Sequence, residues 1–312
     1  MDIVLLFPGQ GSQKPGMGKD LAAAFPAARD TFAAADEALG VALSTLCFEG
    51  PESELTATQN AQPALITHAA ALWAVLGPML GRGLRATAGH SAGELAAYHA
   101  AGSLDLASVV RVVRRRGELM ACAGAERPGA MAAILGLANE AVEDICRRAT
   151  SQAGTVVPAN YNALEQVVIS GEVAGVERAM ALAKESGAKR AIRLNVSGAF
   201  HSPLMAPAAA GLSAALDEAP GRDPQVPVAS NVTAEPVTRW SDGRRLLREQ
   251  LTAPVRWAQE VTRLVHDHPA ALFVELGPGA VLTNLMKRIA PGASAASCST
   301  AADVARLLER VG

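Results

Sequence analysis

Cysteine is scarce in this chain of 312 residues, which contains only Cys47, Cys122, Cys146 and Cys298. The four lie far apart and match neither a disulfide framework nor the ligand spacing of a metal site. This scarcity argues against a secreted domain held by disulfides and against a structural metal centre. We therefore expect a reducing, cytoplasmic compartment and no bound metal.

A dominant charge and long apolar runs are also lacking. The 28 Lys and Arg side chains are balanced by 30 Asp and Glu, so no net field attracts nucleic acid or an anionic membrane, and we expect neither as a partner. No segment has the roughly 18 uninterrupted apolar residues of a membrane span. The first apolar run follows the acidic Asp2 and stops at Pro8, whereas a signal peptide begins with basic residues, so we expect no leader.

A serine flanked by glycines lies where a strand-like segment meets a helix-like one. Residues 86–88 are small and apolar, Gly89-His90-Ser91-Ala92-Gly93 follows, and residues 94–97 favour a helix. The pentapeptide alone arises often by chance, but at a strand-to-helix turn it exposes the serine hydroxyl. Free N–H groups and the dipole of the following helix would favour a developing oxyanion there. Ser91 is therefore the candidate nucleophile.

The order of strand-like and helix-like segments predicts an α/β protein in two parts. Residues 3–7 form a continuous apolar run, typical of a strand buried on both faces of a parallel sheet. Residues 130–196 follow the order βαββαβ, the split βαβ pattern of ferredoxin-like folds. We predict a main domain of residues 1–127 and 197–312, with a ferredoxin-like domain of residues 128–196 inserted in it. Such a junction favours a ligand site in the cleft between the two.

Three helices are expected over residues 19–39, 62–76 and 106–123, the second with Pro63 in its first turn. The third carries Arg111, Arg114, Arg115 and Arg116. Helical arginines usually belong to a solvated face, and we assign the first three to it. Arg116 lies in a more apolar stretch beside Gly117. It is either solvated or paired like the others, or it holds a carboxylate bidentately in a partly dry pocket.

A serine nucleophile needs a general base, and the chain offers six histidines. His90 adjoins Ser91, so its side chain leaves the backbone in another direction. Structural or solvated positions suit His90 as well as His68, His99, His266 and His268. His201 follows the point where the small domain's last strand returns to the main domain, and an imidazole with an ordinary pKa can take and return a serine proton. His201 is therefore the candidate base.

Two further segments have two interpretations each. Phe7-Pro8-Gly9-Gln10-Gly11-Ser12-Gln13 follows the first strand, so it either lines the crevice that holds Ser91 or is a plain connector. Asn160 and Asn162 are expected in the loop between the two middle strands of the small domain. They either face the cleft or serve the backbone geometry of a turn.

Taken together, these motifs resemble the malonyl-CoA:acyl-carrier-protein transacylases and the related acyltransferase domains of polyketide synthases. The match covers nearly the whole chain and runs in the same order. It comprises residues 7–13, Gln62-Pro63, Gly89-His90-Ser91-Ala92-Gly93-Glu94, Arg116-Gly117, Asn160-Tyr161-Asn162, Gln166-Val167-Val168-Ile169-Ser170-Gly171, Gly198-Ala199-Phe200-His201-Ser202, Gln250, Pro254-Val255-Arg256-Trp257 and Glu275-Leu276-Gly277-Pro278-Gly279.

The resemblance implies an α/β-hydrolase-like large domain with a parallel sheet, and a ping-pong route. Malonyl-CoA would load Ser91, with His201 as base and Gln250 orienting the histidine. The phosphopantetheine thiol of an acyl carrier protein would then take the malonyl group. The N–H groups of Gln10 and Ala92 would form the oxyanion hole. No bound cofactor and a monomeric protein are expected.

The resemblance also assigns residues to the acyl pocket. Arg116 would hold the malonyl carboxylate, while Asn160 and Asn162 would line the cleft from the small domain. Phe200 would restrict space at the malonyl α-carbon. Ala92 departs from the family pattern, in which a larger aliphatic residue, or glutamine in methylmalonyl-specific relatives, follows the nucleophile, and this leaves the strictness of malonyl selectivity open.

Three alternatives remain at this stage. A hydrolase could clear acyl chains from carrier proteins with the same serine and histidine, and a transferase could carry a larger acyl group. Neither would need Arg116. A catalytically silent docking module would be expected to lose Ser91 or His201. Whether a malonyl transferase of this kind serves fatty acid or polyketide synthesis is left open by the sequence.

Overall fold

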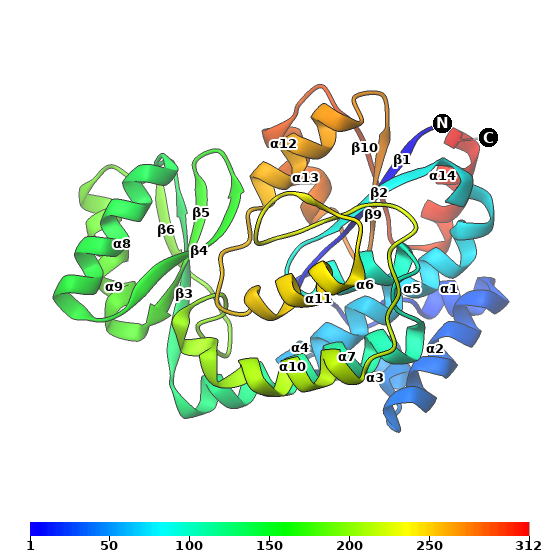
Figure 1. The fold of residues 1–312 in the computed structure, drawn as a ribbon, viewed down its shortest axis with the longest axis horizontal. Helices are drawn as coiled ribbons and strands as arrows, with labels where there is room; N and C mark the ends of the chain where they lie inside the picture. Colours follow the sequence, from blue (N-terminus) through cyan, green and yellow to red (C-terminus); the bar gives the residue numbers. More distant parts are fainter. Residues whose placement is uncertain (312) are drawn as a thin grey trace.

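The computed structural model describes residues 1–311 and contains two sheets with helices packed around them (Figure 1). The larger sheet has six strands in the order β10-β9-β1-β2-β7-β8. These are β1 (Ile3–Phe7), β2 (Leu84–Gly89), β7 (Val228–Ala229), β8 (Pro236–Val237), β9 (Leu272–Leu276) and β10 (Ser294–Cys298). The pairings are parallel, except that β8 runs antiparallel to β7. Every residue of β1 is buried, as its apolar sequence predicts.

Helices surround the larger sheet and line the approach to it. They are α1 (Lys19–Ala24), α2 (Pro26–Leu39), α3 (Leu43–Glu49), α4 (Glu52–Thr56), α5 (Thr58–Leu80), η1 (Gly81–Gly83), α6 (Gly93–Ala100), α7 (Leu106–Glu126), η2 (Pro203–Ala208), α10 (Ala209–Glu218), α11 (Trp240–Glu249), α12 (Trp257–Asp267), α13 (Val281–Ile289) and α14 (Ala301–Val311). The helix expected over 19–39 is interrupted at Phe25, whose backbone is extended. The reason is Pro26, because a proline disfavours helical angles in the residue before it.

The helix expected over 62–76 is longer, and Pro63 lies inside it rather than in its first turn. A proline at this position has no N–H for the carbonyl of Gln59, four residues earlier. Arg114 of α7 donates to that carbonyl through Nη1, at 3.3 Å. A partner from a neighbouring helix therefore allows α5 to begin at Thr58.

In length and composition, the stretch Thr58–Gly83 would suffice to cross a membrane. However, 61% of its most apolar window is buried inside the fold. The helix packs against α2 and α7 in the main hydrophobic cluster. Its lack of charge is accounted for by this position in the core.

The smaller sheet, at the left of Figure 1, has four antiparallel strands in the order β4-β5-β3-β6. Its elements are β3 (Gly129–Leu135), α8 (Asn139–Ala153), β4 (Val156–Ala163), β5 (Gln166–Glu172), α9 (Val173–Glu185) and β6 (Arg190–Arg193). This arrangement confirms the predicted ferredoxin-like fold inserted in an α/β protein. The exact domain limits at 127/128 and 196/197 stay a prediction.

The expected loop position of Asn160 and Asn162 is wrong, because both lie within β4. The strand extends past them because its pairing with β5 continues to Ala163. The main domain also contributes, since the N–H of Tyr161 donates to the carbonyl of Val255 at 2.9 Å. This bond fixes the asparagines at the junction of the two parts.

Candidate active site

Ser91 lies between β2 and α6 with a backbone φ of 54°, in the left-handed region that serine rarely adopts. Gly89 and Gly93 of its motif lie so close to other backbone atoms that neither position has room for a side chain. A Cβ on Gly89 would lie 2.0 Å from the carbonyl of Gly93, and one on Gly93 would lie 2.2 Å from the oxygen of Phe7. The pentapeptide therefore marks a tight crossing of β1, β2 and α6 that projects the serine.

His201 contacts the serine directly, with 2.7 Å between its Nε2 and Ser91 Oγ. On its other side, Nδ1 lies 2.9 Å from the backbone oxygen of Gln250. A carbonyl can only accept, so Nδ1 carries the proton and Nε2 offers its lone pair to the hydroxyl. Burial first, and then the charge of Arg116, lowers the pKa of His201 to about 3. The imidazole is therefore neutral near pH 7, in the form that can accept a proton.

Gln250 contacts His201 through its backbone carbonyl and not through its side-chain amide. The side chain is turned away to other partners: Oε1 accepts from Arg116 Nη2 at 2.9 Å, and Nε2 donates to Glu94 Oε2 at 2.6 Å. The partner of the imidazole is thus a neutral carbonyl where many triads have a carboxylate. Position 250 makes the contact expected of it, while its catalytic role stays a prediction.

Arg116 is only 2% exposed, and its side chain contacts Ser91. Its Nη2 donates to Ser91 Oγ at 3.1 Å and its Nη1 to Gln62 Oε1 at 2.7 Å. It forms no ion pair within residues 1–311. Burial lowers its pKa to about 10, so the guanidinium stays charged at neutral pH. A dry guanidinium held by neutral amides beside a nucleophile is suited to an anionic group of a ligand.

The other arginines of α7 have different partners. Arg114 and Arg115 pair with Glu118 at 2.7 and 3.5 Å, and Arg111 donates to the carbonyl of Ala38. Arg115 and Arg111 are exposed, whereas Arg114 is partly buried. Arg116 is thus the one of the four that faces the serine.

A cavity of about 330 Å³ opens in front of Ser91 and His201, between the two parts of the protein. The loop after β1 lines it, so this loop is not a plain connector. Within residues 1–311, no hydrogen bond is found from the backbone N–H of Gln10 or of Ala92. Both residues border the cavity. The two N–H groups are therefore available as an oxyanion hole.

The small domain and the segment before His201 supply the opposite wall. Asn160, Asn162 and Phe200 all line the cavity. Asn162 also ties the two parts together, because its Oδ1 lies 2.8 Å from Nε2 of His90. His90 packs against Trp257, with 5.7 Å between ring centroids. Of the structural and solvated positions expected for His90, the structural one is therefore observed.

Sequence reasoning missed a buried polar cluster below Ser91. Asn231 Oδ1 accepts the Ser91 N–H at 2.8 Å, while Nδ2 donates to the carbonyl of Gly89 at 2.8 Å and to Glu260 Oε1 at 2.9 Å. The backbone N–H of Asn231 donates to Glu94 Oε2 at 3.2 Å. One side chain therefore joins the nucleophile turn to α12.

Two fully buried acids belong to this cluster. Burial raises the pKa of Glu94 to about 7. It raises that of Glu260 well above the usual range, with the charge of Glu94 adding to the shift. Glu260 shares one helix face with the apolar Trp257, Val261 and Leu264. An acid on the apolar face of an amphipathic helix is a signal from which its burial could have been predicted. Asn231 gave no such signal, since it lies 140 positions from Ser91.

Comparisons with known proteins agree with this geometry. The acyl transferase domain family matches residues 4–308. Malonyl CoA-acyl carrier protein transacylases from Bacillus subtilis (strain 168) and Escherichia coli (strain K12) are 48% and 42% identical, covering 92% and 97% of this chain and 90% and 98% of their own lengths.

Solved structures extend the likeness to the fold. The acyl-carrier-protein-S-malonyltransferase from Bartonella henselae has a TM-score of 0.94 and 39% identity, covering 99% of each chain. A malonyl-transacylase in complex with a type II PKS acyl-carrier protein also has a TM-score of 0.94, with 41% identity over 99% of this chain and 100% of its own. The chain therefore belongs to the malonyl CoA-acyl carrier protein transacylase family.

Proposed function

We propose that this protein transfers a malonyl group from malonyl-CoA to the phosphopantetheine thiol of an acyl carrier protein, through an acyl-enzyme on Ser91. The observation that carries the proposal is the position of Ser91 Oγ, 2.7 Å from the neutral Nε2 of His201 and 3.1 Å from Arg116 Nη2. The first contact activates a nucleophile for acyl transfer. The second places a positive charge where an acyl group with its own carboxylate needs it.

In the loading step, His201 Nε2 takes the hydroxyl proton while Ser91 Oγ attacks the thioester carbonyl. The oxyanion of the tetrahedral intermediate accepts hydrogen bonds from the backbone N–H groups of Gln10 and Ala92. The malonyl carboxylate is separated from the reacting carbon by one methylene group. It accepts the hydrogen bond that Arg116 Nη2 donates to Ser91 Oγ in the free protein. The carbon–sulfur bond then breaks, and the CoA sulfur leaves with the proton from His201.

The second step reverses these roles with a different thiol. The phosphopantetheine thiol of the carrier protein gives its proton to His201 Nε2, and its sulfur attacks the malonyl ester. The ester bond breaks, the proton returns to Ser91 Oγ, and the malonyl thioester leaves with the carrier protein. Because both thiols must use the single cavity in front of Ser91, the mechanism is ping-pong.

Acyl selectivity follows from the charge and the wall of the cavity. Arg116 favours acyl groups with a free carboxylate, which is why neither a hydrolase nor a transferase of larger neutral acyl groups is our choice. Phe200 borders the cavity beside His201 and limits space for a branch on the acyl chain. Ala92 borders the same cavity but has only a methyl group, so it leaves room that a larger side chain would fill. We propose malonyl as the preferred group, with methylmalonyl discriminated mainly by Phe200.

The proposal extends to the partner and the state of the protein. The complex of a related malonyl-transacylase with a carrier protein supports a carrier protein as the acceptor here. We propose a cytoplasmic monomer that uses no bound cofactor, and light scattering after size exclusion tests the monomer. Fatty acid and polyketide carriers would both present the same phosphopantetheine thiol.

Intact-protein mass spectrometry tests the proposed reaction. The protein is mixed briefly with malonyl-CoA, methylmalonyl-CoA and acetyl-CoA in competition, and any adduct is mapped to a peptide. We expect a malonyl adduct on Ser91, none on Ser91→Ala, and its transfer to added phosphopantetheinylated carrier protein. A dominant acetyl adduct, an adduct on another residue, or hydrolysis without transfer would contradict the proposal.

A further inference from the structure

Arg116 and Glu94 are two buried groups of opposite charge that do not touch. One side chain joins them: Arg116 Nη2 donates to Gln250 Oε1 at 2.9 Å, and Gln250 Nε2 donates to Glu94 Oε2 at 2.6 Å. Glu94 is fully buried at the start of α6. The oxygen of the Gln250 amide faces the positive Arg116 and its NH2 group faces Glu94, so the amide dipole favours a positive charge on Arg116 and a negative charge on Glu94.

The surroundings of Glu94 leave Arg116 as its only cationic partner within residues 1–311. Its Oε2 accepts from Gln250 and from the N–H of Asn231. Its Oε1 has no hydrogen-bond partner in the same part of the chain. The other titratable groups that interact with it are Glu260 of α12 and Tyr98 of α6 itself, while His201 interacts with Arg116.

Glu94 is a group whose charge can change near neutral pH. Burial raises the pKa of Glu94 to about 7, against the opposing effects of the hydrogen bonds from Gln250 and Asn231 and, after them, the charge of Arg116. Burial raises the pKa values of Glu260 and Tyr98 well above their usual ranges, which favours the neutral form of each. His201, with its pKa lowered to about 3, is neutral as well.

We propose that Glu94 is the resident counter-charge of Arg116 and that the malonyl carboxylate replaces it, so that loading is linked to proton uptake by Glu94. This inference rests on the proposed malonyl function. Two anions would otherwise share one cation in a dry site, where like charges repel strongly. The proton comes from solvent, and Oε1 is the carboxylate atom free to take it.

The consequence is a pH dependence confined to substrates with a free carboxylate. When Glu94 is protonated, the malonyl carboxylate binds Arg116 without competition from a second negative charge. When Glu94 is ionised, substrate binding requires that Glu94 first takes up a proton. The kcat/KM for malonyl-CoA therefore falls as the pH rises above the pKa of Glu94 in the free enzyme. The fall is at most about tenfold per pH unit for one proton. Acetyl-CoA has no carboxylate to compete, so its profile lacks this fall.

Loading kinetics between pH 6 and 9 test the linkage, with malonyl-CoA and acetyl-CoA as matched substrates. The variant Glu94→Gln keeps the size of the side chain and an oxygen that accepts from Gln250 and Asn231. We expect the malonyl-to-acetyl ratio of kcat/KM to fall with pH in the wild type and to stay level in the variant. Parallel malonyl and acetyl profiles in the wild type, or an unchanged malonyl slope in Glu94→Gln, would overturn the proposal.

Calorimetry gives a test that does not need the Glu94 variant to fold. Malonyl-CoA is titrated into Ser91→Ala, which cannot react, at pH 8 in two buffers of different ionisation enthalpy. We expect uptake of most of one proton per malonyl-CoA and none with acetyl-CoA; equal proton counts for both would overturn the linkage. Failure of the proposed function is distinct, because it would show as a missing malonyl adduct on Ser91 at every pH.

Discussion

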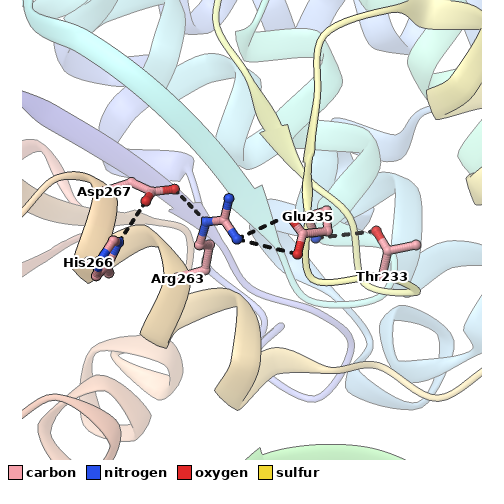
Figure 2. A network of polar contacts seen from close by, with 5 residues as sticks. All are labelled: Thr233, Glu235, Arg263, His266 and Asp267. Atoms are coloured by element: carbon pink, nitrogen blue, oxygen red, sulfur yellow. Dashed lines mark hydrogen bonds and ion pairs between the residues drawn. The ribbon is translucent and has the colours of Figure 1, made fainter.

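Helix α12 carries two polar networks, one on each face. On the inner face, Glu260 is fully buried and joined through Asn231 to the turn that holds Ser91. On the outer face, Arg263 lies between Asp267, at 2.7 Å, and Glu235, at 3.2 Å, with His266 and Thr233 at the ends of the network (Figure 2). Both link the helix to the segment after β7.

The two networks differ in whether water can solvate a polar group that has lost its partner. Each charge of the outer network is exposed and stays solvated when its partner is lost, so the pairs contribute little. In the inner network, each amide and carboxyl group relies on its neighbours, and a lost partner leaves a desolvated group without a hydrogen bond. The structure around Ser91 therefore depends on the inner face of α12, and the following changes test that difference.

The largest effect is expected for Arg116→Met, measured as malonyl loading. Removing the cation that contacts Ser91 should reduce malonyl loading at least about 100-fold, the scale of a lost buried charge contact. Acetyl loading should fall far less. Equal losses for both acyl groups, measured by rapid mixing and mass spectrometry, would refute the carboxylate contact.

The same variant should leave the folded protein almost as stable. A pKa lowered to about 10 means that burial of this charge costs about 3 kcal/mol. Its removal recovers that cost but leaves Gln62 and Gln250 oxygens without a donor, at about 1–3 kcal/mol each. These effects oppose each other, so thermal unfolding should shift little, and a large loss of stability would mean that Arg116 is a structural residue.

The second prediction concerns Asn231→Ala, which removes the centre of the inner network. The Ser91 N–H, the Gly89 carbonyl and Glu260 would each lose a buried partner. We expect a loss of about 3–5 kcal/mol in the free energy of unfolding, measured in urea. The rate of acyl-enzyme formation should fall with it, because the strained backbone of Ser91 loses its anchor. A stable variant with normal loading would show that the turn holds its shape unaided.

The third prediction is a pH effect on stability from Glu94. The folded protein holds this proton more tightly than the unfolded chain, so stability is fully present below the ordinary pKa and declines as the pH rises through about 7. The shift from 4.5 to about 7 corresponds to a decline of about 3 kcal/mol. Urea midpoints of the wild type and Glu94→Gln should diverge between pH 5 and 8 in favour of the variant. A constant difference would exclude a titrating Glu94.

Local chemistry was predictable from the sequence, and long-range partners were not. The glycines around Ser91 and the βαββαβ order depend on neighbouring residues, so the turn and the small domain could be predicted. The orienting contact of His201 comes from a backbone carbonyl, which is the same for any residue type at position 250. Asn160 and Asn162 were misplaced because β5 and Val255 supply the pairing that extends β4. Asn231 is recognisable only once the chain has folded.

The smallest effect is expected for Arg263→Ala, on the outer face of the same helix. This change breaks both the Asp267 and Glu235 contacts of the exposed network in Figure 2. Because water solvates the carboxylates left behind, we expect a shift of less than about 2 °C in Tm, which disappears in high salt. Malonyl loading should be unchanged. A larger shift accompanied by slower loading would mean that the outer network also holds Asn231 in place, and that the two faces of α12 act as one unit.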